Sequence, residues 1–381
     1  MNKINEISTA VSGVPIVLYE GEHIQLIHIP GHSAYTLLTF DIMHAKANGT
    51  SAFASGLAQS RNINFFGIVP KHPCWYPHQE TKEALAILTA LKDRPTIVYG
   101  ASMGGYGTLK YGKAAGGDVA IALGPQATIN GAVCGKDDQR YHKFFDKALH
   151  GHGDAMRVAE ADLCETTIIG VDPDMDKDAF QTSLMPDSEK IDIVHLTHMG
   201  HKCAKAMTPS AHCVAIFETA LAGKTDEVAT LMRKNRDQSL DYFIGLAAAM
   251  LATGDAKAAE VKLAEGIDRH GWSKEAALVR AEIMTGLGRP EDGLADVKAV
   301  AEHQPHVPKF RVALANQLLA MGDYKAAVAE LDSACATDPK PFLMIKLAKM
   351  QRAAGDTKAA AATITRALEL WPNRTRQLGN I

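Results

Sequence analysis

The chain has few of the features that mark several classes of protein. Its six cysteines are scattered among 381 residues without a C-x-x-C pair, which argues against a disulfide framework or a paired-cysteine zinc site. No run of about 18 uninterrupted apolar residues is present, so no membrane span is expected. A net charge of −3 provides no positive field to attract nucleic acid or anionic lipid. We therefore expect a globular protein that binds neither nucleic acid nor membrane.

Signals for export, metals and cofactors are also missing. Residues 1–20 contain no apolar core behind a basic start, so no signal peptide is expected and a cytoplasmic location is the default prediction. The histidine-rich stretch "HGHGD" (150–154) has no second matched cluster of metal ligands, which favours a solvated loop over a metal site. We predict neither a metal nor a cofactor.

What is present first is an alternation of strand-like and helix-like stretches over residues 1–220. The helix-like stretches include 81–92, in which leucines recur at helical spacing, and the segment that begins near residue 104. Strand-like runs rich in β-branched and apolar residues occur at 23–29, 34–40, 63–69, 95–100, 119–125, 166–171 and 191–197. Such alternation predicts an α/β domain with a mostly parallel sheet flanked by helices.

From residue 221 to 381 the strand-like runs disappear and a repeat begins. Its marker is a glycine between two helical stretches, at Gly254, Gly288, Gly322 and Gly355, with spacings of 34, 34 and 33 residues. Small residues recur seven positions before and five positions after each glycine, and a proline stands seventeen after three of them. This region resembles the tetratricopeptide repeat family, whose two-helix unit has this period. The resemblance implies an all-α domain that binds a protein partner or forms a homodimer.

The sequence "TIVYGASMGGYGTLKYG" (96–112) places Ser102 in a G-x-S-x-G pattern between a strand and a helix. Such a pattern forms a sharp turn that exposes the serine hydroxyl at the carboxyl end of the strand. In this context residues 1–220 resemble the α/β-hydrolase family. The resemblance implies Ser102 as nucleophile, followed along the chain by an acid and then a histidine.

His201 is the predicted base, because it follows the last strand and begins a predicted helix; His198 is the alternative. The loop after 166–171 carries four aspartates, of which Asp176 and Asp178 lie where a helix would begin. Those two suit helix capping and the helix dipole. Asp172 and Asp174 therefore remain as the candidates for the acid, and Asp172 is preferred because it ends the strand.

Two backbone N–H groups must stabilise the negative oxygen that develops during acyl transfer. Met103 follows the nucleophile and is predicted to supply one, while Asp41 or Ile42, after the 34–40 strand, is predicted to supply the other. The His-Gly pair that many family members carry there is missing. Trp75 and Tyr76, in a loop at the same sheet edge, either line a substrate pocket or close the core. Residues 126–163 form the insertion that carries the lid in this family.

Two functions follow from these patterns. The first is a serine hydrolase of ester-type substrates, or an acyl transferase with the same acyl-enzyme, carrying a helical-repeat module. The second is a non-catalytic adaptor that uses a hydrolase-like platform and binds a protein through its repeats. The missing His-Gly pair and the ambiguous acid favour the second, whereas Ser102 and His201 favour the first.

Overall fold

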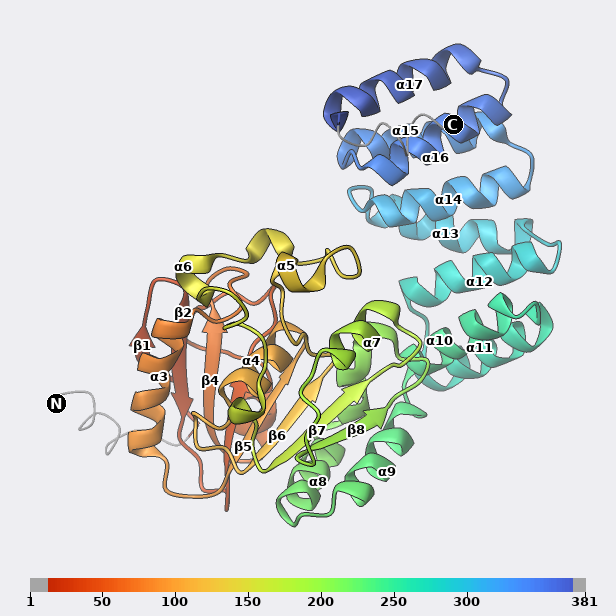
Figure 1. The fold of residues 1–381 in the computed structure, drawn as a ribbon. Helices are drawn as coiled ribbons and strands as arrows, with labels where there is room; N and C mark the ends of the chain where they lie inside the picture. The colour runs from red at the N-terminus through yellow and green to blue at the C-terminus, as the bar shows by residue number, and fades with distance from the viewer. Residues whose placement is uncertain (1–12, 373–381) are drawn as a thin grey trace. The chain divides into compact units, whose positions relative to one another are not determined.

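The computed structural model describes residues 13–372, which fall into two compact units (Figure 1). The first unit ends at Tyr242 and contains a sheet with helices on both faces, whereas the second begins at Phe243 and consists of helices. The predicted classes, α/β followed by all-α, therefore agree with the observed architecture.

The first unit is built on one eight-stranded sheet with the order β1-β2-β4-β3-β5-β6-β7-β8. β1 and β2 pair antiparallel, as do β2 and β4, and every later pairing is parallel. The strands are β1 (Ile16–Glu20), β2 (Ile24–Ile29), β3 (Thr36–Phe40), β4 (Asn64–Pro70), β5 (Thr96–Ala101), β6 (Val119–Leu123), β7 (Thr166–Val171) and β8 (Ile191–His195). All seven predicted strands are confirmed, while β1, a short strand at the edge, was not predicted.

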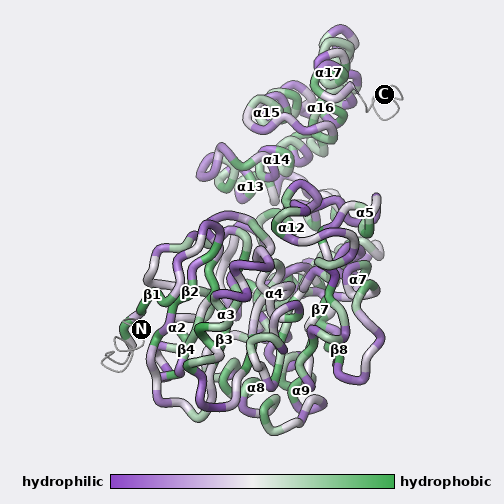
Figure 2. The backbone as a smooth tube through the Cα atoms, turned by 60° about the vertical axis from the view of Figure 1, so that its left-hand side comes forward, coloured by the Kyte–Doolittle hydropathy of each residue, from purple (hydrophilic) through white to green (hydrophobic). Residues whose placement is uncertain are grey.

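Successive residues of the central strands point to opposite faces of the sheet and enter different cores. Leu37 of β3 packs with α2 (Ser55–Ser60), α8 (Ser210–Leu221) and α9 (Thr225–Arg236). Its neighbour Leu38 packs on the other face with α3 (His78–Leu91) and α4 (Met103–Tyr111). Figure 2 shows the hydropathy of these segments along the backbone. Because both faces are covered, the central strands β3, β4 and β5 are buried along their whole length instead of at every second residue.

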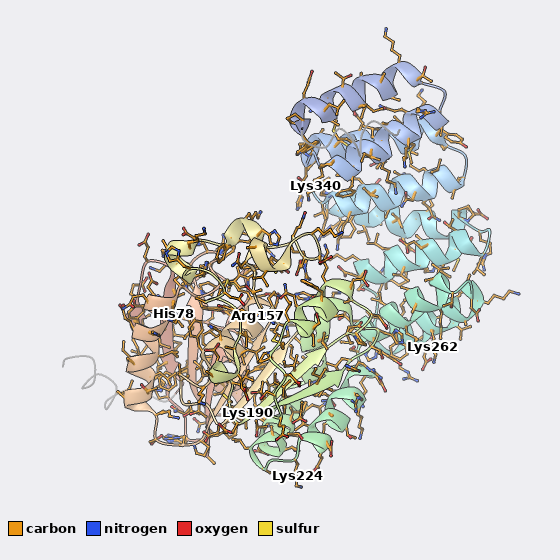
Figure 3. The ribbon with its side chains drawn as sticks, in the orientation of Figure 1. His78, Arg157, Lys190, Lys224, Lys262 and Lys340 are labelled. Carbon is orange, nitrogen blue, oxygen red and sulfur yellow. The ribbon has the colours of Figure 1, made fainter. Side chains whose placement is uncertain are left out.

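The predicted lid insertion, residues 126–163, forms short helices joined by turns between β6 and β7. Arg157, labelled in Figure 3, donates hydrogen bonds from Nε and Nη2 to the Leu184 carbonyl oxygen at 2.9 and 2.7 Å. The helical turns are α5 (Gly131–Cys134), η1 (His142–Phe144), α6 (Lys147–His150) and η2 (Glu160–Asp162). Beyond β7 come α7 (Asp176–Ser183) and, after β8, the 3-10 segment η3 (Gly200–Met207). The insertion is thus tied down to the segment that follows α7.

The boundary between the units lies later than the predicted division at 220/221. Phe217 of α8 and Met232 of α9 are fully buried in the same core as the strand residues Leu37 and Ile97. These helices therefore complete the cover of the sheet. Sequence alone assigned α9 to the second domain because α9 belongs to the strand-free sequence that begins near residue 221.

The second unit consists of helix pairs, and the predicted repeat markers lie at equivalent places in each pair. Gly254, Gly288, Gly322 and Gly355 stand in the turns with φ between 73° and 89°. The helices are α10 (Leu240–Ala252), α11 (Ala256–His270), α12 (Lys274–Gly286), α13 (Glu291–His303), α14 (Pro308–Ala320), α15 (Tyr324–Thr337), α16 (Pro341–Ala353) and α17 (Thr357–Leu370). The small residues are buried where helices meet: a Cβ on Gly293 would lie 2.7 Å from the Cα of Ala281.

Candidate functional site

Ser102 stands at the junction of β5 and α4 in a strained backbone conformation, with φ of 54° and ψ of −120°. Positive φ costs a residue with a side chain on the order of 1–3 kcal/mol. The turn is tight because α4 packs directly on the sheet: a Cβ on Gly104 would lie 2.1 Å from the carbonyl oxygen of Phe40. The predicted sharp turn is therefore present, and it leaves the Ser102 side chain at the carboxyl end of β5.

His201 reaches Ser102 from the first turn of η3, just beyond the last strand. Its Nε2 lies 2.8 Å from Ser102 Oγ, although the two residues are 99 positions apart in the chain. Gly200, with φ of 55°, makes the turn that directs the imidazole toward the sheet edge. The predicted pairing of serine and histidine is thus found, and His198 is not the histidine that contacts Ser102.

The carboxylate that contacts His201 belongs to Asp178, not to Asp172 or Asp174. Asp178 Oδ2 lies 2.6 Å from His201 Nδ1, and its side chain is fully buried. Asp172 is buried too, but its carboxylate accepts hydrogen bonds from the N–H groups of Gly200, at 2.7 Å, and Asp174, at 3.1 Å. Asp174 itself is exposed. The helix dipole argument was wrong because Asp178, unlike the exposed Asp176, lies on the buried side of α7 and contacts the imidazole.

Arg140, from the insertion, binds the second oxygen of Asp178. Its Nη1 lies 2.8 Å from Asp178 Oδ1, while its Nε and Nη2 donate to both oxygens of Asp138 at 2.8 and 2.9 Å. Burial works to lower the pKa of Arg140, but its hydrogen bonds to Asp138 and Asp178 outweigh burial and hold that pKa above the ordinary value. Asp138 also accepts a hydrogen bond from Gln181 Nε2 at 2.9 Å. The buried charges are therefore paired, which fixes the Asp178 carboxylate in place.

Gly124 leaves the space that the histidine and aspartate occupy. With a Cβ, this residue would approach His201 Nδ1 to 3.3 Å and Asp178 Oδ2 to 3.6 Å, and its φ is 53°. Sequence reasoning missed Gly124, Arg140 and Asp178. For Gly124 a signal was available: the Gly-Pro step directly after β6, at the same sheet edge as the turn at Ser102.

The predicted second N–H donor is not available in this structure. The Asp41 N–H donates to the Ile68 carbonyl oxygen at 3.1 Å, and the Ile42 N–H donates to the Asp41 carboxylate at 2.8 Å. The Asp41 N–H continues the pairing of β3 with β4, whereas the Ile42 N–H is engaged because the Asp41 side chain folds back on its own loop. Met103, by contrast, begins α4, and the first N–H groups of a helix have no partner within it.

Trp75 and Tyr76 lie behind the site instead of lining a pocket. Both side chains are fully buried, which supports the core-closing alternative. Trp75 donates a hydrogen bond from Nε1 to Gln126 Oε1 at 3.2 Å, and the Tyr76 hydroxyl donates to the carbonyl oxygen of Asp41. The two aromatic residues therefore support the loops around Ser102 from within the core.

A cavity of about 620 Å³ opens beside Ser102 and His201. Its walls are mostly apolar and come from the segment after β3, from α2, β5, η3 and α8, and from the insertion between β6 and β7. They include Ile42, Phe53, Leu57, Tyr99, Tyr141, Met207 and Cys213. Burial raises the pKa of the Cys213 thiol to about 12, so this sulfur remains a protonated, apolar wall residue near neutral pH. The cavity is of the size that small-molecule sites have.

Within residues 13–372, one cluster has a composition that would suit a metal ion, namely Glu22, His23 and Glu80. The Glu80 carboxylate accepts hydrogen bonds from the N–H groups of residues 22, 23 and 24 at 3.0 to 3.3 Å. This carboxylate therefore holds the turn between β1 and β2.

The comparisons with known proteins concern the second unit. Residues 308–350 match the tetratricopeptide repeat family model. This stretch spans α14, α15 and most of α16, so this part of the second unit matches a tetratricopeptide repeat. A search of the curated proteins finds no match to the chain.

Among solved structures, MamA (41-end) from Desulfovibrio magneticus RS-1 is 15% identical, with coverage of 45% of this chain and 97% of that chain and a TM-score of 0.34. TTC0263, a thermophilic TPR protein in Thermus thermophilus, is 20% identical over 44% of this chain and 93% of its own, with a TM-score of 0.34. These likenesses are too weak to bear on function. Between residues 13 and 372, no helix combines the length and apolar character that a membrane span requires.

Proposed function

We propose that the first unit is a serine hydrolase that acts on ester-type bonds through an acyl-enzyme. The observation that supports this most directly is the chain of contacts from Ser102 Oγ to His201 Nε2, at 2.8 Å, and from His201 Nδ1 to Asp178, at 2.6 Å. A serine hydroxyl is a weak nucleophile until a base accepts its proton and a third group orients that base. The contacts supply both conditions.

In the proposed reaction His201 carries its proton on Nδ1, donated to Asp178, and accepts the Ser102 proton on Nε2. Ser102 Oγ bonds to the carbonyl carbon and gives a tetrahedral intermediate, which collapses as His201 returns the proton to the leaving alcohol. Water then attacks the acyl-enzyme by the same route and releases the acid. An acceptor other than water would make the reaction an acyl transfer.

The cavity wall supports a substrate with an apolar group next to the reacting carbonyl. Phe53, Leu57 and Met207 offer no charge to a polar substituent, and burial of an apolar group against them is favourable by about 25 cal/mol per Å². We therefore propose acyl esters with an aliphatic or aromatic acyl group.

A fluorophosphonate probe tests the hydrolase proposal. We expect covalent labelling of the wild-type chain and loss of labelling in Ser102→Ala, with Ser60→Ala, the same change at an exposed serine, as the matched control. Hydrolysis of p-nitrophenyl esters of increasing acyl length then tests the substrate class. If the wild-type chain neither labels nor hydrolyses any ester, the proposal is wrong.

A second candidate function is protein binding without catalysis. The family match concerns the repeats alone, so the comparisons favour a binding or self-association role over the enzyme. Light scattering of the full chain across a range of concentrations measures self-association, and a pull-down with the same chain measures partner binding. A monomer that recovers no partner, together with measurable Ser102-dependent turnover, would contradict the adaptor function.

A further inference from the structure

The proposed reaction places negative charge on the substrate oxygen, and the structure leaves one of its two stabilising donors unassigned. The first N–H groups of α4, beginning at Met103, are free of helix partners. The Asp41 and Ile42 N–H groups are already engaged, at 3.1 and 2.8 Å. Another donor at the mouth of the cavity is therefore needed.

Tyr141, contributed by the insertion, lines the same cavity as Ser102 and His201. Its ring is held from two sides: the Trp75 ring lies 4.9 Å away between centroids, and the Arg140 guanidinium lies 5.2 Å from the ring centre. Arg140 is in turn fixed by Asp138 and Asp178. The side chain of Tyr141 is thus pre-positioned by contacts to a core aromatic residue and to the buried charge network.

Tyr141 and Ser102 lie on the wall of the same cavity, within reach of a side-chain hydrogen bond. Burial raises the pKa of this phenol, against opposing contributions from Arg140 and from a hydrogen bond with the Ser102 side chain. The net direction is upward from an ordinary value near 10, so the hydroxyl keeps its proton at neutral pH and is able to donate it in a hydrogen bond.

We propose that the Tyr141 hydroxyl is the second donor to the developing oxyanion, opposite the N–H of Met103. This inference rests on the proposed hydrolase function. The hydroxyl donates a hydrogen bond and transfers no proton, so the reaction balances as written above. Such a donor acts on the transition state more than on the bound ester. A donor from the insertion would also replace the one expected from the loop after β3, where the His-Gly pair is missing.

The test compares Tyr141→Phe with the wild-type full chain on p-nitrophenyl butyrate. The variant keeps the ring between Trp75 and Arg140 and removes the hydroxyl alone. We expect kcat to fall about 10²-fold, in line with loss of one oxyanion donor, with KM within about twofold. Affinity for a trifluoromethyl ketone, which binds as a charged tetrahedral adduct, is expected to fall by a similar factor. Tyr19→Phe is the matched control, because that hydroxyl bonds Glu83 away from the cavity.

The outcomes separate this inference from the proposed function. If the wild type turns over through Ser102 but Tyr141→Phe keeps kcat within about twofold, Tyr141 is not the donor and the inference is wrong, while the proposed hydrolase function stands. A rise in KM with unchanged kcat would also overturn the inference, because it indicates ground-state binding. Absence of Ser102-dependent turnover in the wild type overturns both.

Discussion

At the scale of single residues, the loop after β7 shows how similar carboxylates acquire different environments. Asp172 accepts hydrogen bonds from two backbone N–H groups and so positions the turn at Gly200. Asp178 instead contacts the His201 imidazole and the Arg140 guanidinium. Both carboxylates are buried, so burial does not distinguish them. The distinction lies in what each oxygen contacts.

Asp178→Asn tests the proposed role of this carboxylate. The amide retains the size of the side chain but no longer stabilises a charged imidazole, so we expect kcat/KM for ester hydrolysis to fall about 10³- to 10⁴-fold. Asp174→Asn, at an exposed position in the same loop, is expected to change kcat/KM less than twofold. Equal losses in the two variants would contradict the assignment.

A second residue-scale prediction concerns strain at Ser102. Glycine adopts positive φ without the penalty that a side chain imposes there. Allowing for the extra freedom of glycine in the unfolded chain, we expect Ser102→Gly to be about 1 kcal/mol more stable than Ser102→Ala. Urea unfolding of both variants measures this difference. A less stable glycine variant would show that the φ of 54° carries no strain.

At the scale of elements, the insertion between β6 and β7 contributes to the centre of the site. Arg140 and Tyr141 both belong to this insertion. Gln181 of α7 holds it at two places: it donates a hydrogen bond to Asp138 and accepts one from the Ala127 N–H at 2.8 Å. The insertion is therefore a fixed wall of the site, held by buried polar contacts.

Replacing Arg140 by methionine tests how much this wall depends on one charge. The change leaves the buried carboxylates of Asp138 and Asp178 without their cation, and breaking such a network typically costs about 3–5 kcal/mol. We expect urea unfolding to report a loss of that size. Lys143→Met, at an exposed position of the same insertion, should change stability by less than about 0.5 kcal/mol. A small effect of Arg140→Met would mean that the network does not hold the insertion.

At the scale of the whole molecule, buried histidines link stability of the first unit to pH. Burial lowers the pKa of His28, whose Nε2 lies 3.0 Å from Asn64 Oδ1, and burial also lowers the pKa of His150. The unfolded chain binds protons at these residues near pH 6.5, whereas the folded chain binds them only at lower pH. Stability is therefore fully present above about pH 6.5 and is lost as the pH falls through the folded pKa values.

We expect the free energy of unfolding to decrease on acidification from pH 7.5 to pH 5, as measured by urea unfolding at each pH. His28→Gln should flatten this dependence, because glutamine takes up no proton in either state. His32→Gln, at an exposed histidine, should leave the slope unchanged. A wild-type stability that rises on acidification would contradict the prediction.

The sequence by itself determined the features that depend on local pattern. Apolar strands alternating with helices, the glycine period of the repeats and the strand–serine–helix turn at Ser102 each arise from residues close together in the chain. His201 was also predictable, because the end of the last parallel strand lies at the same sheet edge as the turn at Ser102.

Only the tertiary structure decided which groups meet at that edge. Asp178 contacts His201 because it lies on the buried side of α7. Arg140 and Tyr141 come from an insertion whose path no periodicity specifies. The Asp41 N–H is likewise occupied through the pairing of β3 with β4, and the Ile42 N–H through the way its loop folds on itself. Side-chain contacts across loops depend on backbone paths over many residues, whereas pattern in a sequence reports only what neighbours along the chain prefer.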